Sequence, residues 1–488
     1  MRSWIPITLL FLLFVPAAAT ATQSHAVDGD AALSPDGTTV STVPVPVRPG
    51  TIFPGTEWAW AESPEALGWS SEKLAAARAY ADRIGSAAVM IVDDGLVVDA
   101  WGDIERKYHC HSMRKSLMSA LYGVFFAEGA IDLGLSLEDL GIDDKMPLTR
   151  AEKQATVADL LKARSGVYIP AAGEAQSMRD VRPERGSHAA GTFWYYNNWD
   201  FNTLGTIFNQ ETDERSIYTA FQARIAQPIG MQDYRPESLR YSYVDYSEHP
   251  YYGFDMSTRD LARFGLLFLR EGRWRDKRIV TREWVRESTA SHSEIGPESG
   301  YGYMWWTGSG NGLFSGVRVA EHCYYASGYG GHLVVVLPYL DLVIVHRVDT
   351  FQPGNEVPSE AFGVLLWLIL DAAGQTDIGE PPFIDLAPGV RLDERGLRDT
   401  IPGSTLRAVD GPYKTVAVSE LDGTLSLYVD GTLIYTGTWW IEEDRYCADV
   451  PGTDIGGCLH AVLDGNTLRF YELDGSLSIK FTIMEDGS

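Results

Sequence analysis

Two pairs of strand-like runs, separated by more than two hundred residues of mainly helical pattern, constrain the fold of this chain most strongly. The first pair, 87–92 and 96–101, flanks Asp94-Gly95, a dipeptide typical of tight hairpin turns. The second pair occupies 333–337 and 342–348. Strands at both ends of a domain with helices between them predict an α+β fold, in which one antiparallel sheet carries helices and an inserted helical lobe. We expect the binding cleft between the sheet and that lobe.

Apolar residues at helical spacing predict several helices around this sheet. The segment 112–129 has an apolar stripe formed by Met113, Leu117, Ala120, Leu121 and Val124. Ser71 is expected to cap a helix that runs to Ile84. Further helices are expected at 157–162, at 257–271 and at 359–373, where Gly374 ends a buried helix.

The first 21 residues have the pattern of a secretory signal peptide. Arg2 precedes an apolar run at 4–16, and Ala19-Thr20-Ala21 is a cleavage site of the small-x-small type. The run is short for a membrane span, although an uncleaved anchor is the alternative. Since no other stretch of the sequence approaches the length of a transmembrane helix, we expect a secreted or periplasmic protein without a stable membrane span after signal cleavage.

Composition divides the rest of the chain into three parts. Residues 22–55 are rich in Thr, Pro, Gly and Ser without periodicity, and they predict a flexible leader. Residues 56–375 contain the expected sheet and helices. Residues 376–488 predict a linker and an all-β accessory domain for stabilisation or accessory binding. There, short β-type runs are punctuated by the pairs Asp422-Gly423, Asp430-Gly431, Asp464-Gly465 and Asp474-Gly475.

The charge of the chain limits its partners. With 66 acidic and 40 basic residues, the net charge is -26. Such a charge argues against nucleic acid as a partner and favours a soluble protein. The sequence gives no oligomeric state.

Export would place the four cysteines in an oxidising compartment. Cys447 and Cys458 flank a turn rich in Pro, Gly and Asp, so a local disulfide is predicted there. Cys110 and Cys323 could pair if both flank one active site, but the sequence leaves their connectivity open.

The motif Ser112-Met113-Arg114-Lys115 opens the helix at 112–129 and is the first candidate for chemistry. Residues three apart share one face of a helix, so the motif places an amine beside a hydroxyl. A serine is a weak nucleophile until a neighbouring base takes its proton. The same spacing occurs at Ser70 and Lys73, but that copy lies at a helix start, and we assign its serine to capping.

Several segments, in order, resemble the serine β-lactamase and penicillin-binding-protein superfamily. The likeness is to its class C-like branch, which includes esterases, D,D-peptidases and 6-aminohexanoate-oligomer hydrolases. The Ser112 motif matches the S-x-x-K of that superfamily. The other matching segments are LLKARSG at 160–166, GTFWYYNNWDFNTLG at 191–205, MSTRDLARFGL at 256–266 and YGYMW at 301–305. The resemblance covers about residues 56–373 and implies a serine hydrolase that needs no cofactor.

Two registers fit the Y-x-N motif of this superfamily: Tyr195 with Asn197, or Tyr196 with Asn198. Counting from Gly191 within the matching segment selects the second register. The resemblance implies that Ser112 attacks a carbonyl while Lys115 and Tyr196 share the proton transfers. It also implies that Asn198 orients Lys115 or binds the substrate. A lysine can act as base if burial or nearby positive charge lowers its pKa, or it can stabilise a tyrosinate, and the sequence leaves both open.

The K-T-G strand segment of the superfamily corresponds here to Ala326-Ser327-Gly328, which Tyr329 follows. The resemblance implies an oxyanion hole formed by the backbone N–H groups of Ser112 and Tyr329, with Ser327 and Gly328 beside the substrate. Ala326 replaces the lysine that binds the substrate carboxylate in lactamases and peptidases. This departure favours neutral esters or amides. His332 could partly compensate, although a histidine that enters a strand is more often structural.

The sequence therefore predicts a secreted serine hydrolase that cleaves ester or amide bonds of a small molecule or short peptide through an acyl-Ser112 intermediate. A D,D-carboxypeptidase or class C-like β-lactamase is the enzymatic alternative, and a non-catalytic ligand-binding scaffold is the second.

His109 and His111 do not make a metal site, because no distant ligand cluster completes one. The sequence has no Gly-x-Ser-x-Gly, which disfavours an α/β-hydrolase. The aromatic stretch 194–199, with Trp305 and Trp306, lines a pocket or packs a core.

Overall fold

The structure is a computed structural model that describes residues 52–239, 241–314, 316–379, 389–409, 414–453, 456–472, 475 and 477–484. The described residues form two compact units, 52–379 and 389–484. The expected signal peptide and nearly all of the expected leader lie outside the described residues. We describe each unit by itself.

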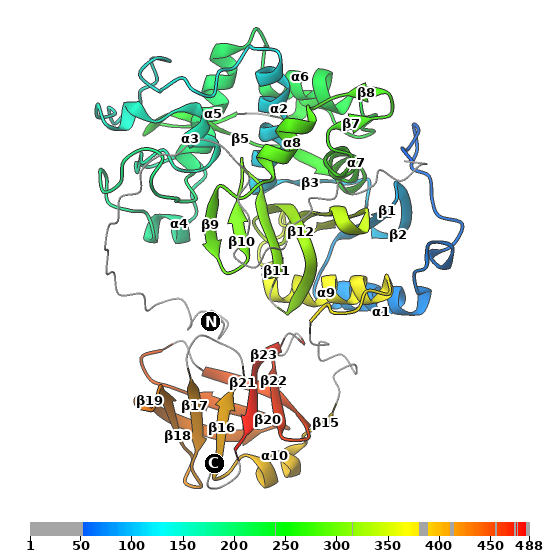
Figure 1. Ribbon diagram of the computed structural model, residues 1–488, viewed down its shortest axis with the longest axis vertical. Helices are drawn as coiled ribbons and strands as arrows, with labels where there is room; N and C mark the ends of the chain where they lie inside the picture. Colours follow the sequence, from blue (N-terminus) through cyan, green and yellow to red (C-terminus); the bar gives the residue numbers. More distant parts are fainter. Residues whose placement is uncertain are drawn as a thin grey trace, which may run out of the picture. The chain divides into compact units, whose positions relative to one another are not determined.

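The first unit is built on one antiparallel sheet with the strand order β2-β1-β14-β13-β12-β11-β10-β9 (Figure 1). Both predicted hairpins are present, and they lie side by side because β1 pairs with β14, with Ile91 opposite Ile344. The single antiparallel sheet expected from the sequence is thus confirmed. The strands are β1 (Ala88–Asp93), β2 (Leu96–Gly102), β9 (Ser293–Gly296), β10 (Ser299–Tyr301), β11 (Trp306–Phe314), β12 (Val317–Gly328), β13 (His332–Leu337) and β14 (Leu342–Arg347).

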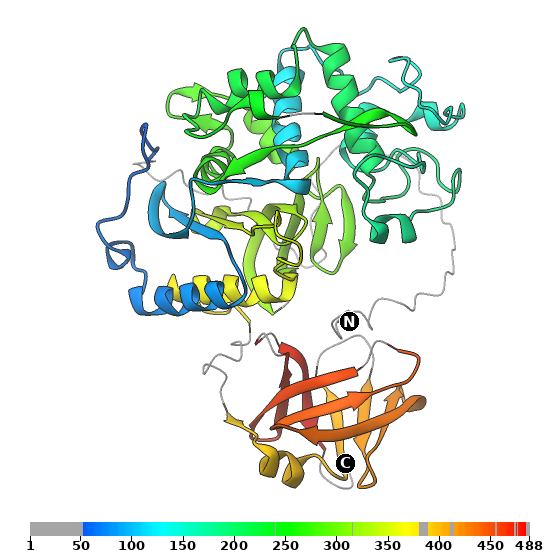
Figure 2. The same cartoon turned by 180° about the vertical axis from the view of Figure 1, so that it is seen from behind.

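Helices cover both faces of this sheet, which explains why every residue of β13 and β14 is buried. On one face, α7 (Thr258–Leu269) packs on β13 and β14, where Gly265 lies against Val334 and Val343. On the other face, α9 (Ser359–Ala372) and α1 (Ser71–Arg83) lie side by side (Figures 1 and 2). No helix among the described residues is long and apolar enough to cross a lipid bilayer.

The helical lobe lies between the two hairpins in sequence and has α2 (Arg114–Ala127) at its centre. The residues of the predicted apolar stripe are all buried, and the rest of the helix from Arg114 to Phe125 is buried as well. The helix is enclosed because α5, α6, α8 and β12 all contact it, and Gly123 leaves room for the ring of Trp284. The other elements of this unit are α3 (Val157–Leu161), α4 (Gln176–Asp180), α5 (Asn198–Glu211), α6 (Ile217–Phe221), α8 (Arg282–Ser288), β3 (Lys107–His109), β4 (Tyr241–Val244), β5 (Ser247–Tyr252), β6 (Asp255–Ser257), β7 (Arg273–Trp274) and β8 (Lys277–Arg278).

The second unit is the all-β domain that the sequence predicts, with one short helix, α10 (Glu394–Thr400). Eight strands, β16 to β23, follow one another around an antiparallel sheet that closes because β21 also pairs with β22. Asp430-Gly431 turns between β18 and β19, whereas Asp474 lies outside the described residues. The strands are β15 (Val390–Arg391), β16 (Ser404–Ala408), β17 (Thr415–Ser419), β18 (Thr424–Val429), β19 (Thr432–Glu442), β20 (Arg445–Asp449), β21 (Gly456–Asp464), β22 (Thr467–Tyr471) and β23 (Leu477–Ile483).

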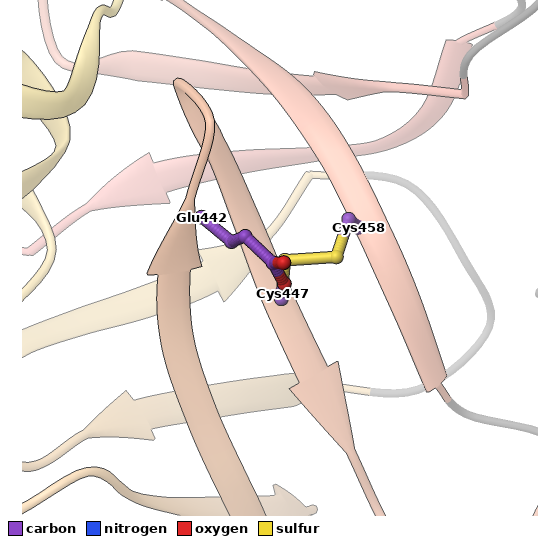
Figure 3. A group of neighbouring side chains, drawn as sticks. All are labelled: Glu442, Cys447 and Cys458. Carbon is purple, nitrogen blue, oxygen red and sulfur yellow. A yellow bond between two sulfur atoms is a disulfide. The ribbon is translucent and has the colours of Figure 1, made fainter.

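The predicted disulfide between Cys447 and Cys458 is confirmed, and it joins neighbouring positions of β20 and β21. Figure 3 shows Glu442 beside it. Among the described residues, these three side chains form the one group with the spacing of a metal site. The sulfurs of Cys447 and Cys458 are bonded to each other, so the two cysteines offer no thiolate to a metal.

The possible pairing of Cys110 with Cys323 is wrong, since both thiols are free and buried. The Cys110 carbonyl lies against Gly328 at the end of β12, whereas Cys323 is five residues earlier on the same strand and donates to the Gly308 carbonyl. Five residues of strand span about 16 Å, and a disulfide needs Cα atoms within about 7 Å.

Candidate active site

Ser112 lies in a tight turn, His111–Met113, between β3 and α2. His111 has a left-handed backbone with φ of 46°, which a residue with a side chain rarely adopts. Its ring is held in place, because Nε2 lies 2.8 Å from Oγ1 of Thr350 and the ring contacts His109 and His332. Such a conformation persists only where the surroundings enforce it, so these contacts fix how the turn presents Ser112.

The structure brings Ser112, Lys115 and Tyr196 together, as the spacing and the resemblance implied. Nζ of Lys115 lies 2.8 Å from Oγ of Ser112 and 2.8 Å from Oη of Tyr196. Lys115 is 2% exposed, and its Nζ lies over the rings of Tyr196 and Phe201, at 4.4 Å and 4.7 Å from their centroids. The three polar atoms therefore form a compact group in surroundings that are otherwise aromatic.

Burial sets the protonation states of this group. It is the main cause that lowers the pKa of Lys115 well below its ordinary 10.5, and the Arg114 cation lowers it further. Burial also raises the pKa of Tyr196 to about 12. Both shifts favour uncharged side chains, a neutral amine beside a protonated phenol. Of the two states that the sequence left open, the structure favours the lysine as base over the tyrosinate.

The geometry also separates the two registers of the Y-x-N motif. Tyr196 reaches Lys115, whereas the hydroxyl of Tyr195 donates to the Met178 carbonyl at 2.7 Å. Asn197 caps α5, and its Oδ1 accepts from the Trp199 N–H. The residues of the first register thus have structural partners.

Asn198 begins α5 and is buried. Its Nδ2 donates to the Gly173 carbonyl at 2.7 Å, and no hydrogen bond joins it to Lys115 among the described residues. Its Oδ1 is buried without a partner. Of the two roles that the resemblance implied, orienting Lys115 is therefore not seen.

The end of β12 lies against the Ser112 turn. A Cβ on Gly328 would come within 2.5 Å of the Cys110 carbonyl, so only glycine allows this close approach. Side chains alternate along a strand, which turns Ser327 away from this contact and leaves it half-buried. Tyr329 follows, with an exposed side chain whose hydroxyl donates to Glu356. The end of β12 at Gly328 thus lies against the turn that carries Ser112.

His332 lies under the His111 turn and has structural partners. It is fully buried; its Nδ1 accepts from Nε of Arg347 at 2.9 Å, and its Nε2 lies 3.2 Å from Oγ1 of Thr350. Burial, with the Arg347 cation, lowers its pKa far below the ordinary range, so the ring is neutral. The described contacts do not join it to the Ser112 group, and it supplies no cation for the missing lysine.

Sequence reasoning missed two features beside the Ser112 group. Nδ1 of His109 lies 2.8 Å from the Asp255 carboxylate, and its Nε2 lies 3.2 Å from the Tyr251 hydroxyl. Arg114 is fully buried next to Lys115. A signal for Arg114 was present, since an arginine followed by a long apolar run is unusual. His109 had no signal, because its partners are about 145 residues away in the chain.

Aromatic side chains form one wall of the site. The ring of Trp306, the first residue of β11, lies 5.3 Å from that of Tyr196 and 5.1 Å from that of Tyr301. Tyr325 stacks on Trp306 from the neighbouring strand, with the rings 6.2 Å apart. Trp306 and Tyr325 are half-buried, whereas Trp305 of the predicted aromatic stretch is fully buried and packs in the core.

The sheet, the helical lobe and the serine-lysine pair at the head of a buried helix define the class of the protein: a serine hydrolase of the β-lactamase and penicillin-binding-protein type. The chain belongs to the beta-lactamase family, whose profile matches residues 72–366. No curated protein sequence is similar enough to count as a match.

Solved structures with this fold are similar to the chain at low identity. An octameric penicillin-binding protein homologue from Pyrococcus abyssi is 16% identical with a TM-score of 0.50, covering 85% of this chain and 99% of that one. A protein provisionally described as a 6-aminohexanoate-dimer hydrolase, from Bacillus anthracis, is 20% identical with a TM-score of 0.48, covering 61% and 81%. At these identities the likeness shows the fold alone.

Proposed function

We propose that this protein is a secreted serine hydrolase that cleaves carboxylic ester or amide bonds through an acyl-Ser112 intermediate. One observation carries the proposal: Nζ of Lys115, buried and with a lowered pKa, lies 2.8 Å from both the Ser112 hydroxyl and the Tyr196 hydroxyl. A neutral amine in contact with a hydroxyl is the arrangement that activates a serine.

Acylation begins when Oγ of Ser112 attacks the substrate carbonyl and its proton passes to Nζ of Lys115. The tetrahedral oxyanion accepts hydrogen bonds from the backbone N–H groups of Ser112 and Tyr329. The hydroxyl of Tyr196 then protonates the leaving alcohol or amine, and the Lys115 ammonium returns a proton to the tyrosine oxygen. The acyl-enzyme and both neutral side chains remain.

Deacylation repeats these transfers with water. The water oxygen attacks the acyl carbonyl while its proton passes to the Lys115 and Tyr196 pair, and the second tetrahedral oxyanion forms in the same hole. The bond to Oγ of Ser112 breaks, the serine regains a proton and the carboxylic acid leaves.

The preference for neutral esters or amides rests on position 326. Ala326 is 1% exposed and uncharged, and His332 is neutral, so neither supplies the cation that would bind a substrate carboxylate. Tyr325, on the same strand as Ala326, and Trp306, on the neighbouring strand β11, offer an apolar surface. These features favour an uncharged substrate over a penicillin or a D,D-peptide.

Turnover of p-nitrophenyl esters and of nitrocefin by purified protein, with Ser112→Ala as the control, tests this preference. We expect ester hydrolysis that the variant loses and little hydrolysis of nitrocefin. Efficient nitrocefin turnover with esters untouched would make the lactamase or D,D-carboxypeptidase alternative the better one. The scaffold alternative would be favoured if a fluorophosphonate probe labels neither protein.

Secretion is supported by the N-terminal pattern of the sequence and by the disulfide in the second unit. Fractionation of the producing cells with N-terminal sequencing of the exported protein tests it. We expect a mature protein that begins near residue 22. A full-length protein retained in the cytoplasm would contradict export.

A further inference from the structure

Arg114 is a buried cation without a counter-ion, one residue before the proposed base. Its side chain is 0% exposed, and no carboxylate forms an ion pair with it in the described part of the chain. Nη2 donates to Oδ1 of Asn202 at 2.8 Å, while Nε and Nη1 have no acceptor. The guanidinium carbon lies 4.2 Å from the ring centroids of both Tyr251 and Tyr252.

Such an arrangement is costly for folding alone. A cation taken out of water needs a partner to recover its lost hydration, and one amide with two ring faces recovers only part of it. A neutral side chain of the same length would pack between the two rings without that cost. Folding stability therefore does not explain why a charged side chain occupies this position.

The cation lies where it acts on the proposed base. Arg114 and Lys115 contact consecutive residues of α5, because Arg114 reaches Asn202 while Nζ of Lys115 lies over the ring of Phe201. Two positive charges buried at neighbouring positions of one helix, in surroundings of low polarity, repel each other. Arginine keeps its charge across the working range of enzymes, so the lysine is the group that loses its proton.

No described group around the pair neutralises the cation. The titratable side chains that face it are phenols, and burial raises the pKa of each: Tyr196 before α5, Tyr218 on α6, Tyr251 and Tyr252 on β5, and Tyr301 on β10. The buried carboxyl on α5, Asp200, accepts from Ser165 and Asn197, and burial raises its pKa well above the ordinary value. The field of Arg114 at Lys115 is thus left unopposed.

We propose that Arg114 is a positioning residue of the Ser112 site: its unneutralised guanidinium holds Lys115 as the neutral amine that takes the serine proton. The proposal rests on the proposed function for its catalytic meaning. Its electrostatic content is independent of that function, because the charge of Lys115 can be measured without any reaction.

The direct test is Arg114→Gln, which removes the cation. Asn202→Asp is the second variant: it adds a carboxyl within reach of Arg114 and replaces the Nδ2 that donates to the Ala172 carbonyl at 2.9 Å, so the ionisation of the new carboxyl is measured as well. Arg263→Gln is the matched control, since Arg263 is also fully buried, lies 5.3 Å from the ring of Trp58 and donates to backbone carbonyls away from the Ser112 turn.

The readout is an NMR titration of protein labelled with ¹³C at the lysine ε carbon. The chain has nine lysines, and Lys115→Arg assigns the signal that matters. We expect Lys115 to titrate well below the other lysines in the wild type. Its pKa should rise by about one unit or more in Arg114→Gln and in Asn202→Asp with an ionised carboxyl, and should not move in Arg263→Gln.

An unchanged Lys115 titration in folded Arg114→Gln, or in folded Asn202→Asp whose new carboxyl is ionised, would overturn the proposal. The same conclusion follows if Lys115 titrates with the surface lysines in the wild type. Labelling of Ser112 by a fluorophosphonate is measured in parallel. If Lys115 shifts upward in the variants but Ser112 of the wild type is not labelled, the electrostatic coupling is supported and the hydrolase mechanism is rejected, so the two failures are distinct.

Discussion

At the scale of single residues, two uncharged side chains beside one hydroxyl define the chemistry. The buried amine of Lys115 and the buried phenol of Tyr196 both contact this site in the forms that burial favours. A neutral amine takes the serine proton, and a protonated phenol gives one to the leaving group. In the proposed reaction, these protonation states make Lys115 the base and Tyr196 the acid.

Tyr196→Phe should lower kcat for an ester substrate by about a hundredfold or more, because the variant keeps the ring and loses the proton donor. Tyr195→Phe is the matched control, since the hydroxyl of Tyr195 donates to the Met178 carbonyl. Steady-state kinetics of both variants measure the difference. Near-normal turnover by Tyr196→Phe would show that the acid is another group.

The pH dependence of kcat/KM should follow Lys115 and Tyr196. A lysine acts as base only when neutral, so activity is lost as the pH falls through its pKa. That pKa lies well below the ordinary 10.5, and Tyr196 ionises near pH 12. We expect a rise with pH that ends well below 10.5, followed by a plateau into the alkaline range. A rise centred near 10.5 in stopped-flow ester hydrolysis would contradict the lowered pKa.

Among the helices, the Ser-x-x-Lys motif occurs twice in this chain and has a different role in each place. Ser70 precedes α1 and accepts from the Lys73 N–H, which confirms the assignment of that copy to capping and moves the cap from the expected Ser71. Ser112 lies in a turn that β12 and β13 both contact. The context of the motif, rather than its spacing, decides its role.

Ser70→Ala should therefore lower the free energy of unfolding by about 1 kcal/mol, the usual effect of losing a serine cap, and leave ester turnover unchanged. Urea unfolding of the variant and the wild type measures the loss. A large loss of turnover in folded Ser70→Ala would mean that the motif at the start of α1 takes part in catalysis.

Local signals predicted the elements that neighbours in sequence determine. The turn at Asp94-Gly95 and the alternating runs around it gave β1 and β2 almost to the residue. The predicted stripe on α2 is buried, but no local signal indicated that elements distant in sequence enclose the helix on its other sides as well. The pairing of Cys110 with Cys323 stayed open for a related reason, since the sequence does not show how far along β12 Cys323 lies from the site.

The residues of the candidate site also divide into those that the local sequence indicates and those that depend on distant elements. Ser112 and Lys115 were predictable from their own helix, and Tyr196 from the resemblance of the segment around it. The contacts of His109 with Asp255 and Tyr251 depend on β3 pairing with β6, which no local pattern indicates.

At the scale of the whole molecule, the Ser112 group is built from residues 52–379 alone, and the second unit has its own core. The disulfide joins two strands of the second unit. The Ser112 group thus lies in the first unit and the disulfide in the second.

The double variant Cys447→Ala, Cys458→Ala should lose about 2–4 kcal/mol of stability in the second unit and keep wild-type kcat for a small ester. Calorimetry should show one transition that moves to lower temperature and one that does not. A fall in kcat that parallels the loss of stability would show that the second unit supports the active site.

Rapid acid quench of an ester reaction, followed by peptide mass spectrometry, shows directly whether Ser112 carries the acyl group. We expect the peptide that contains Ser112 to gain the mass of the acyl group in the wild type. The same peptide should gain it far more slowly in Tyr196→Phe and never in Ser112→Ala. An acyl group found on another residue, or ester turnover by Ser112→Ala at the wild-type rate, would contradict this expectation.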